Sequence, residues 1–328
     1  MILSSPRAVD VPSLVAATRE GRPRAVARLI SLVEDGHPAL REVMAALVPD
    51  AGRAHVVGLT GAPGVGKSTA TSALVTAYRC AGRRVGVLAV DPSSPFSGGA
   101  LLGDRIRMSE HAADPEVFIR SMASRGHLGG LSRAAPQALR VLDAAGCDVI
   151  LLETVGVGQS EVEVAGTADT TVVVLAPGMG DGIQAAKAGI LEVADILVVN
   201  KADRDGAART ASELRSMVAM ADRGGAPSWT PPVVSTQAHT ATGIEALVGA
   251  IRDHRDWLGE DGLLARRTRR ASREVEALAL EALRSGMSGT TGGGRLQALA
   301  ADVAARRTDP YSAADVLVSS VRSGVRPG

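Results

Sequence analysis

The sequence contains very few lysines and few aromatic residues. Of its 36 basic residues only three are lysines, Lys67, Lys187 and Lys201. Aromatic side chains make up 2% of the chain, so a hydrophobic core must be built from aliphatic residues. The net charge is +1 and no basic run is interleaved with aromatics, which argues against nucleic acid as a partner. Because arginine serves wherever charge alone is needed, the remaining lysines are candidates for roles that need a compact ammonium group.

The two cysteines are too far apart in the sequence to suggest a disulfide scaffold or a metal site. Cys80 and Cys147 both lie in apolar stretches, and we expect both thiols to be buried. No uncharged apolar stretch reaches the about 18 residues that a membrane-spanning helix needs. The first twenty residues contain Asp10 and Glu20 and lack the pattern of a signal peptide. The sequence therefore predicts a cytoplasmic protein with no membrane partner.

Short apolar runs alternate with helical patterns in the central part of the chain. Continuous apolar strands of this kind are typical of an α/β fold, a mostly parallel sheet covered by helices on both faces. Ligands of such sheets bind beyond the carboxyl ends of the strands, and polar motifs directly follow several of these runs. The runs are 56–59, 84–90, 149–153, 171–176, 196–200 and 233–235.

The regions on either side of this pattern are predicted to be helical. Residues 12–50 show the period of amphipathic helices, so we expect an N-terminal helical extension over 1–52. After Leu258 the strand pattern stops and helical patterns continue. We therefore predict a sheet domain over 53–258 and a helical C-terminal arm over 259–328.

The most specific motif is a glycine-rich loop between the first strand and a helix. Gly61–Ser68 fits G-x-x-x-x-G-K-[ST], the P-loop. Its glycines let backbone N–H groups turn inward around phosphates, and the following helix presents its positive end to the anion. Lys67 is expected to reach the β- and γ-phosphates and the Ser68 hydroxyl to bind Mg²⁺. The predicted nucleotide contacts in this loop are Gly61, Gly64, Val65, Gly66, Lys67, Ser68 and Thr69.

A second motif, Asn200–Asp203, follows the fifth strand and fits N-K-x-D. A carboxylate can accept from both N1–H and the exocyclic amine of guanine, whereas adenine offers no such pair of donors. Asp203 is therefore expected to select guanine, with Asn200 steadying the loop and the Lys201 stem lying along the base. The loop after the next strand, with Gln237 and Ala238, is expected to supply a backbone N–H to the base.

Carboxylates at the ends of two other strands are candidate metal ligands. The sequence E-T-V-G at Glu153–Gly156 stands where GTPases commonly have D-x-x-G, whose acidic residue holds Mg²⁺ and whose glycine contacts the γ-phosphate. Asp91 ends the second strand, and Asp104 is a further candidate. Because Mg²⁺ keeps several waters, not all of these residues need to bind it directly. The predicted catalytic residues are Lys67, Asp91 and Glu153.

Two segments have both an ordinary and a functional interpretation. Gln184 and Lys187 share a helix face after a glycine-rich loop, and from the residue pattern alone an exposed helix start is the better interpretation. His127 lies between glycines and could act as a base, although a hydrogen-bonded loop histidine is the more common case.

Taken together, these segments resemble the MeaB/ArgK-type GTPases, which attend adenosylcobalamin-dependent acyl-CoA mutases. The likeness covers roughly residues 10–325, and the run E-T-V-G-V-G-Q-S-E is its most specific part. The matching stretches include Gly61–Thr69, Asp91–Phe96, Gly103–Arg105, Leu128–Gly130, Glu153–Glu161, Gly180–Asp181 with Gln184 and Lys187, and Asn200–Asp203.

The resemblance implies a fold, ligands and site residues. The fold is the dimeric branch of P-loop GTPases related to signal-recognition and metal-insertion GTPases, and the ligands are GTP or GDP and Mg²⁺. The C-terminal arm would serve dimerisation, and an additional mobile switch loop would carry Gln184 and Lys187. The implied Mg²⁺ site consists of Ser68, Asp91, Asp104 and Glu153.

The resemblance also implies a role, a homodimeric chaperone that protects a mutase such as methylmalonyl-CoA mutase and gates cofactor loading or release. Gln237 and Arg105 depart modestly from the family pattern. No arginine finger or water-orienting glutamine is evident, so we expect slow hydrolysis that a partner accelerates. Two alternatives stay open: a small-substrate kinase, and a metal-delivering GTPase, which would need clusters of His or Cys that six scattered histidines do not suggest.

Overall fold

The computed structural model describes most of the chain. The described residues are 9–91, 108–123, 134–154, 160–178, 192–220, 228–288 and 293–324. Of Asp91 only the backbone is described. The chain divides into two compact units, Met1–Arg266 and Arg267–Gly328. Five residues singled out from the sequence lie outside the described residues, namely Asp104, His127, Gly156, Gln184 and Lys187.

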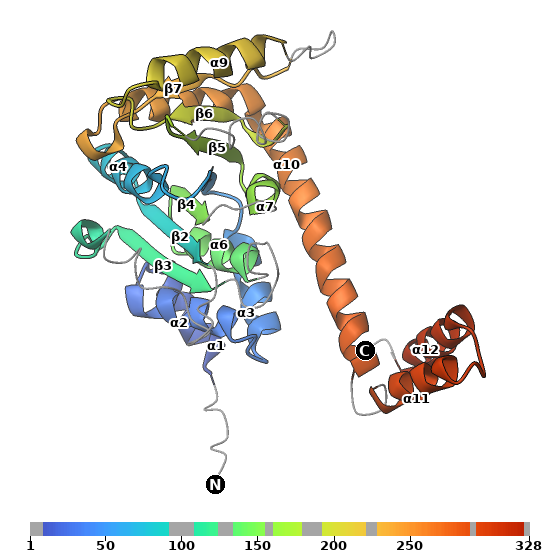
Figure 1. Ribbon diagram of the computed structural model, residues 1–328. Coiled ribbons are helices and arrows are strands. Elements are labelled where there is room, and N and C mark those ends of the chain that lie inside the picture. The colour runs from blue at the N-terminus through green and yellow to red at the C-terminus, as the bar shows by residue number, and fades with distance from the viewer. Residues whose placement is uncertain are drawn as a thin grey trace. The chain divides into compact units, whose positions relative to one another are not determined.

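A seven-stranded parallel sheet forms the centre of the first unit (Figure 1). Its strand order is β3-β2-β4-β1-β5-β6-β7. Strands β1, β4, β5 and β6 are buried at every position, as expected of strands covered on both faces. The predicted α/β class is thereby confirmed. The strands are β1 (His55–Thr60), β2 (Val85–Asp91), β3 (Val117–Ala123), β4 (Val149–Thr154), β5 (Thr170–Leu175), β6 (Ile196–Val199) and β7 (Val233–Ser235).

Successive residues of a strand are buried by helices on opposite faces of the sheet. Val56 of β1 packs in one cluster with the first three helices and α6, whereas its neighbour Val57 packs with α4 and the beginning of α10. This alternation follows from the two-residue period of a strand. The helices of the first unit are α1 (Val11–Arg19), α2 (Pro23–Glu34), α3 (Leu40–Leu47), α4 (Lys67–Cys80), α6 (Ala135–Ala144), α7 (Ser160–Thr167), α9 (Ala207–Met220) and the first part of α10 (Ile244–Ser288); the short helices are η1 (Val48–Asp50), η2 (Ser109–His111) and η3 (Ala238–Thr240).

Strand β3 lies at the edge of the sheet and was not expected from the sequence. Its segment V-F-I-R-S-M-A contains Arg120 and Ser121, which interrupt the continuous apolar pattern. Arg120 donates hydrogen bonds to Ser31 and Glu34 of α2, so its charge is paired beside the core. Polar residues are tolerated here because β3 has a partner strand on one side only.

The N-terminal helices belong to the same core as the sheet. Leu29, Ile30 and Leu47 are fully buried in the cluster that also holds Ile150 of β4. The described part of the segment predicted as an extension over 1–52 is therefore packed directly onto one face of the sheet. No helix among the described residues has the length and apolarity needed to cross a membrane.

The second unit consists of the end of α10 together with α11 (Gly293–Ala304) and α12 (Pro310–Gly324). Within α10, Gly259 has φ +57° and ψ −169°, so the helix is interrupted there. This interruption lies beside the boundary predicted near residue 258, whereas the compact units divide after Arg266.

The expectation that both thiols are buried is wrong for one of them. Cys147 is buried, and burial raises the pKa of its thiol. Cys80 is exposed because it is the last residue of α4 and faces away from the sheet-side core. An apolar sequence neighbourhood does not reveal which helix face a residue occupies at a helix end.

A buried ionic cluster at the amino end of β6 fixes α10 to the sheet. Arg266 donates to both carboxylate oxygens of Asp195, at 2.7 and 2.6 Å. His254 Nε2 lies 3.2 Å from Asp195 Oδ1, and the Thr171 N–H donates to Oδ2 at 2.8 Å. Burial raises the pKa of Asp195, but the contacts with His254 and Arg266 outweigh it and lower the pKa to about 2.

This cluster makes the stability of the protein depend on pH in a defined window. Because the folded-state pKa of Asp195 lies below its unfolded value of about 3.9, the stabilisation is present above that pH and is lost as the pH falls toward about 2. We expect Asp195→Asn to lower the free energy of unfolding by about 2 kcal/mol at pH 7, with a smaller difference at pH 3. Urea denaturation at both pH values measures this.

The matched control is Asp253→Asn, which removes a carboxylate from an exposed pair with Arg252. It should change the free energy of unfolding by less than about 0.5 kcal/mol. If Asp195→Asn lowered the free energy of unfolding by the same amount at pH 3 and at pH 7, the assignment of the Asp195 pKa would be contradicted.

Candidate nucleotide-binding site

The predicted motifs meet at the carboxyl edge of the sheet. Strand β1, which leads into the P-loop, lies between β4 and β5. Leu59 of β1 pairs with Glu153 of β4, and Glu153 in turn pairs with Ala89 of β2, two residues before Asp91. Parallel strands therefore bring the end of β2, the acidic end of β4 and the P-loop to one edge, although they are far apart in the sequence.

Two glycines of the P-loop occupy positions that no other residue could take. Gly61 has φ +140°, and a Cβ atom there would lie 2.1 Å from the carbonyl oxygen of Val174. Gly66 has φ +94°, and its Cβ would lie 2.4 Å from Nδ2 of Asn200. The loop thus passes close to β5 and to the N-K-x-D motif. It delivers the chain into α4, whose N-terminal N–H groups provide a site for an anion.

Two of the three lysines hold the P-loop from opposite sides. Lys67 is buried, and its ammonium donates to the carbonyl oxygens of Gly61 at 2.6 Å and Ala62 at 3.1 Å. Lys201 donates to the carbonyl oxygen of Gly64 at 2.6 Å. Lys201 has φ +56°, an unusual value for a residue other than glycine, of the kind found at functional sites. Contact of Lys67 and Lys201 with the nucleotide stays a prediction.

Asn200 is buried and links three segments by hydrogen bonds. Its Nδ2 donates to the carbonyl oxygen of Val65 at 2.9 Å. Its Oδ1 accepts from the Thr236 hydroxyl and from the Ala238 N–H, both at 3.1 Å. The P-loop, the end of β6 and the loop after β7 are thereby held together by one side chain that is 2% exposed.

Two backbone N–H groups of the loop after β7 donate to other groups of the protein. The N–H of Gln237 donates to the carbonyl oxygen of Thr242, while that of Ala238 is taken by Asn200. Asp203 of the N-K-x-D motif is exposed, and its contact with guanine stays a prediction. Contact of Gln237 and Ala238 with the base remains a prediction.

Hydroxyl oxygens of α4 and the carboxylate oxygens at the end of β4 lie together. The Ser68 hydroxyl donates to Glu153 Oε1 at 2.6 Å, and the Thr71 hydroxyl donates to Oε2 at 3.0 Å. Hard oxygen donors of this kind fit Mg²⁺. The part of the chain that the structure describes contains no group of three or more His, Cys, Asp or Glu side chains able to hold a metal. Thr71 was not predicted as a site residue; it lies three residues after Ser68, on the same face of α4.

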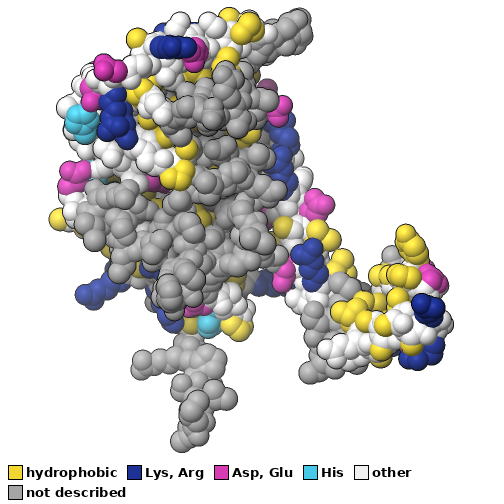
Figure 2. Space-filling model, in the orientation of Figure 1, with side chains coloured by type: hydrophobic (Ala, Val, Ile, Leu, Met, Phe, Trp, Pro, Cys, Tyr) yellow, Lys and Arg dark blue, Asp and Glu magenta, His cyan; other side chains and the backbone are white. Residues whose placement is uncertain are grey.

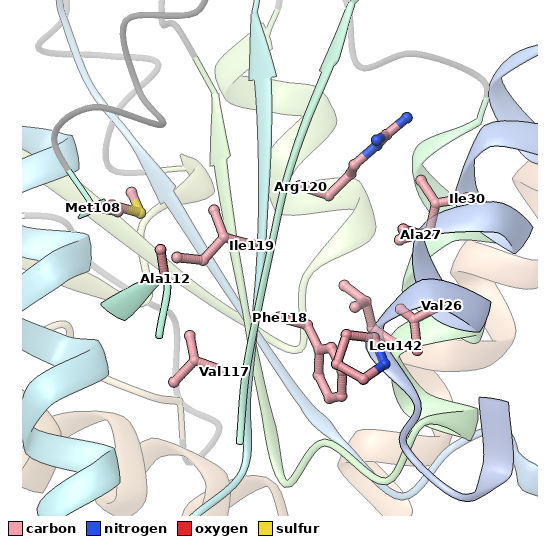
Figure 3. A pocket seen from close by; sticks show the side chains of 11 residues that line it. Val26, Ala27, Ile30, Met108, Ala112, Val117, Phe118, Ile119, Arg120 and Leu142 are labelled. Carbon is pink, nitrogen blue, oxygen red and sulfur yellow. The ribbon is translucent and has the colours of Figure 1, made fainter. Parts of the chain in front are cut away.

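An apolar hollow of about 260 Å³ at the edge of the sheet is separate from this site (Figure 3). Ile30 of α2 and Phe118 of β3 line it, and its one charged lining residue, Arg120, is paired with Glu34. No residue of the P-loop or of the N-K-x-D motif lines it. The hollow therefore lacks the groups that bind phosphate, and we place the nucleotide at the carboxyl edge.

The role of Asn200 can be tested by exchanging its donor group for an acceptor. In Asn200→Asp, a carboxylate oxygen would face the carbonyl oxygen of Val65, and the two would repel each other. We expect GDP affinity to fall by roughly tenfold or more, because a buried hydrogen bond is replaced by an unpaired charge. Titration calorimetry measures this. Thr240→Val, on the exposed side of the same region, is the control, and equal affinities for both variants would refute the role.

Comparison with known proteins agrees with this geometry. The profile of the methylmalonyl-CoA mutase-associated GTPase MeaB family matches residues 26–291. A protein of Pyrococcus abyssi assigned as a GTPase is 45% identical over 316 residues, which are 96% of this chain and 98% of the relative. GTPase ArgK of Escherichia coli is 39% identical over 257 residues, 75% of this chain and 76% of that protein.

The fold is also found in a solved structure, that of a LAO/AO transport system kinase. The two chains superpose with a TM-score of 0.70 at 27% identity, covering 95% of this chain and 97% of the other. The words transport system kinase apply to that protein. The family profile that matches most of this chain is that of a GTPase family. With its P-loop and N-K-x-D motif at one sheet edge, this chain is a GTP-hydrolysing member of the MeaB family of methylmalonyl-CoA mutase-associated GTPases.

Proposed function

We propose that this GTPase is a cytoplasmic chaperone of an adenosylcobalamin-dependent acyl-CoA mutase, methylmalonyl-CoA mutase or a close relative. In this role it protects the mutase and gates cofactor loading or release. The observation that carries the proposal is the profile match over residues 26–291, because that family is described by its association with methylmalonyl-CoA mutase. The described residues contain no group of three or more His, Cys, Asp or Glu side chains of the kind that a metal-delivery role would use.

The proposed chemistry is hydrolysis of GTP with Mg²⁺ held at the edge of β4. Lys67 neutralises charge on the phosphates, and the backbone N–H groups of the P-loop orient them. The Ser68 hydroxyl and the Glu153 carboxylate, which lie 2.6 Å apart, hold the metal, with Asp91 and Asp104 as further candidate ligands. When bound, Mg²⁺ offsets the negative charge of the β- and γ-phosphates.

Two parts of the protein are proposed to respond to whether GTP or GDP is bound. They are Gly156, at the γ-phosphate, and a switch loop that carries Gln184 and Lys187. These residues follow β4 and β5, whose carboxyl ends flank the P-loop. A loop placed there can respond to the presence of a γ-phosphate. This response would transmit the nucleotide state to the mutase.

We further propose that the protein is a homodimer formed through the second unit. Figure 2 shows hydrophobic side chains gathered over α11 and α12. Exposed apolar surface of this extent marks interaction sites in soluble proteins. The exposed large hydrophobic residues of this unit are Val275, Leu278, Leu280, Leu283, Leu296, Tyr311, Val316 and Val318.

Guanine selection by Asp203 is tested with Asp203→Asn. An amide can accept from N1–H of a purine but offers a donor at the second position, which suits the C2 carbonyl of xanthine rather than the amine of guanine. We expect GTP affinity to fall on the order of 100-fold and xanthosine triphosphate affinity to rise. Competition binding measures both. Asp205→Asn, a change at the exposed neighbour, is the control and should keep the preference for GTP.

The chaperone role is tested by single-turnover hydrolysis of GTP with and without methylmalonyl-CoA mutase. No arginine finger is evident in the sequence, so we expect slow hydrolysis by the protein alone and at least about tenfold acceleration by the mutase. Equal rates would contradict the role.

A pull-down from native cells with GTP-loaded protein identifies the client by mass spectrometry, with Lys67→Ala as the control that is defective in nucleotide binding. Recovery of a nickel enzyme or a transporter subunit without a mutase would overturn the proposal.

A further inference from the structure

Thr71 lies one helical turn after Ser68 on α4 and faces the same carboxylate. Its hydroxyl donates to Glu153 Oε2 at 3.0 Å, while Ser68 donates to Oε1 at 2.6 Å. Thr71 is completely buried, and Glu153 is 4% exposed. Two hydroxyl groups of one helix therefore hold the two oxygens of one buried carboxylate.

The Thr71 hydroxyl has a second possible acceptor, the carbonyl oxygen of Lys67 at 3.0 Å. Bonds of this kind to residue i−4 are common for threonine within helices and carry no functional meaning by themselves. However, a hydroxyl group has a single hydrogen to donate. A carboxylate is the stronger acceptor of the two, and the Lys67 carbonyl already receives the backbone N–H of the helix. The two distances are equal at 3.0 Å, so it is the greater acceptor strength of the carboxylate that favours Glu153 as the principal acceptor.

The need for such a contact follows from the residue at the end of β4. Glutamate has one more rotatable bond than the aspartate that is common at this position in GTPases, so its carboxylate loses more side-chain entropy when it becomes ordered. Ser68 restrains this carboxylate at Oε1 and Thr71 restrains it at Oε2. Because both hydroxyl groups lie on the same helix, the two contacts together define the direction in which the carboxylate faces.

We propose that Thr71 is a positioning residue that orients the Glu153 carboxylate for Mg²⁺ bound with the nucleotide. The inference rests on the proposed metal role of Glu153 and extends it to a residue that does not touch the metal or the nucleotide. A purely structural threonine would affect stability but would leave the Mg²⁺ dependence of nucleotide binding unchanged.

The chain offers a matched control on the same helix. Thr76 makes the same kind of bond to residue i−4, from its hydroxyl to the carbonyl oxygen of Ser72 at 3.2 Å. Thr76 lies outside the motifs of the nucleotide site. Thr76 is exposed, unlike Thr71, so Thr76→Val removes a hydroxyl with the same backbone contact from the middle of α4 without affecting the orientation of Glu153.

The experiment measures binding of a non-hydrolysable GTP analogue by calorimetry, first in EDTA and then over a series of Mg²⁺ concentrations. For Thr71→Val we expect the Mg²⁺ concentration of half-maximal effect to rise about tenfold, the scale of one buried hydrogen bond to a charged group. Thr71→Ser, which keeps the hydroxyl, and Thr76→Val should stay within about twofold of the unmodified protein. Affinity in EDTA should be the same for all variants. Thermal melting verifies that each is folded, and Thr71→Ala replaces Thr71→Val if valine prevents folding.

The outcomes separate this inference from the proposal on which it rests. An unchanged Mg²⁺ dependence in Thr71→Val, or an equal change in Thr76→Val, would overturn the positioning role. Glu153→Gln is measured in parallel. If Glu153→Gln also leaves the Mg²⁺ dependence unchanged, the metal role of Glu153 is itself wrong, whereas a large effect of Glu153→Gln beside none for Thr71→Val rejects the role of Thr71 alone.

Discussion

The parallel pairing of β1 with β4 on one side and β5 on the other is the constraint on which the site depends. It places the P-loop, which leaves β1, beside the acidic end of β4. The first turns of α4 then lie over β4, so Ser68 and Thr71 both reach Glu153. A shift of β4 by one residue would turn Glu153 to the opposite face and remove both contacts, because successive strand residues alternate in direction.

The same edge of the sheet also brings side-chain donors to the carbonyl oxygens of the P-loop. P-loop carbonyl oxygens accept from Lys67, Lys201 and Asn200, so the loop is held in shape by donors from two places in the chain, the loop's own end and the N-K-x-D motif. A preformed loop binds phosphate without a further loss of backbone freedom, which favours affinity. Asn200 couples this loop to the loop after β7, and the contact between Ser68 and Glu153 couples it to the end of β4. The site therefore behaves as one connected network rather than as separate motifs.

Much of the site could be predicted from the sequence because its motifs are local. The P-loop and N-K-x-D each follow a buried strand, and their residue types indicate which groups of a nucleotide they bind. Thr71 could not be identified in this way, since a threonine inside a helix is ordinary until its partner Glu153 is brought beside it by the sheet. Strand β3 was missed for a related reason, because Arg120 breaks the apolar pattern and is neutralised only by contacts with α2.

The sequence by itself determined the α/β class, the nucleotide chemistry and the family, since apolar periodicity and contiguous motifs depend on neighbouring residues alone. Only the tertiary structure decided the strand order, the exposure of Cys80, the pairing of Asp195 with Arg266, and the orientation of the Glu153 carboxylate by two hydroxyl groups. Each of these depends on contacts between segments separated by tens of residues. Such contacts follow from how the sheet and helices pack, and no local pattern in the chain encodes them.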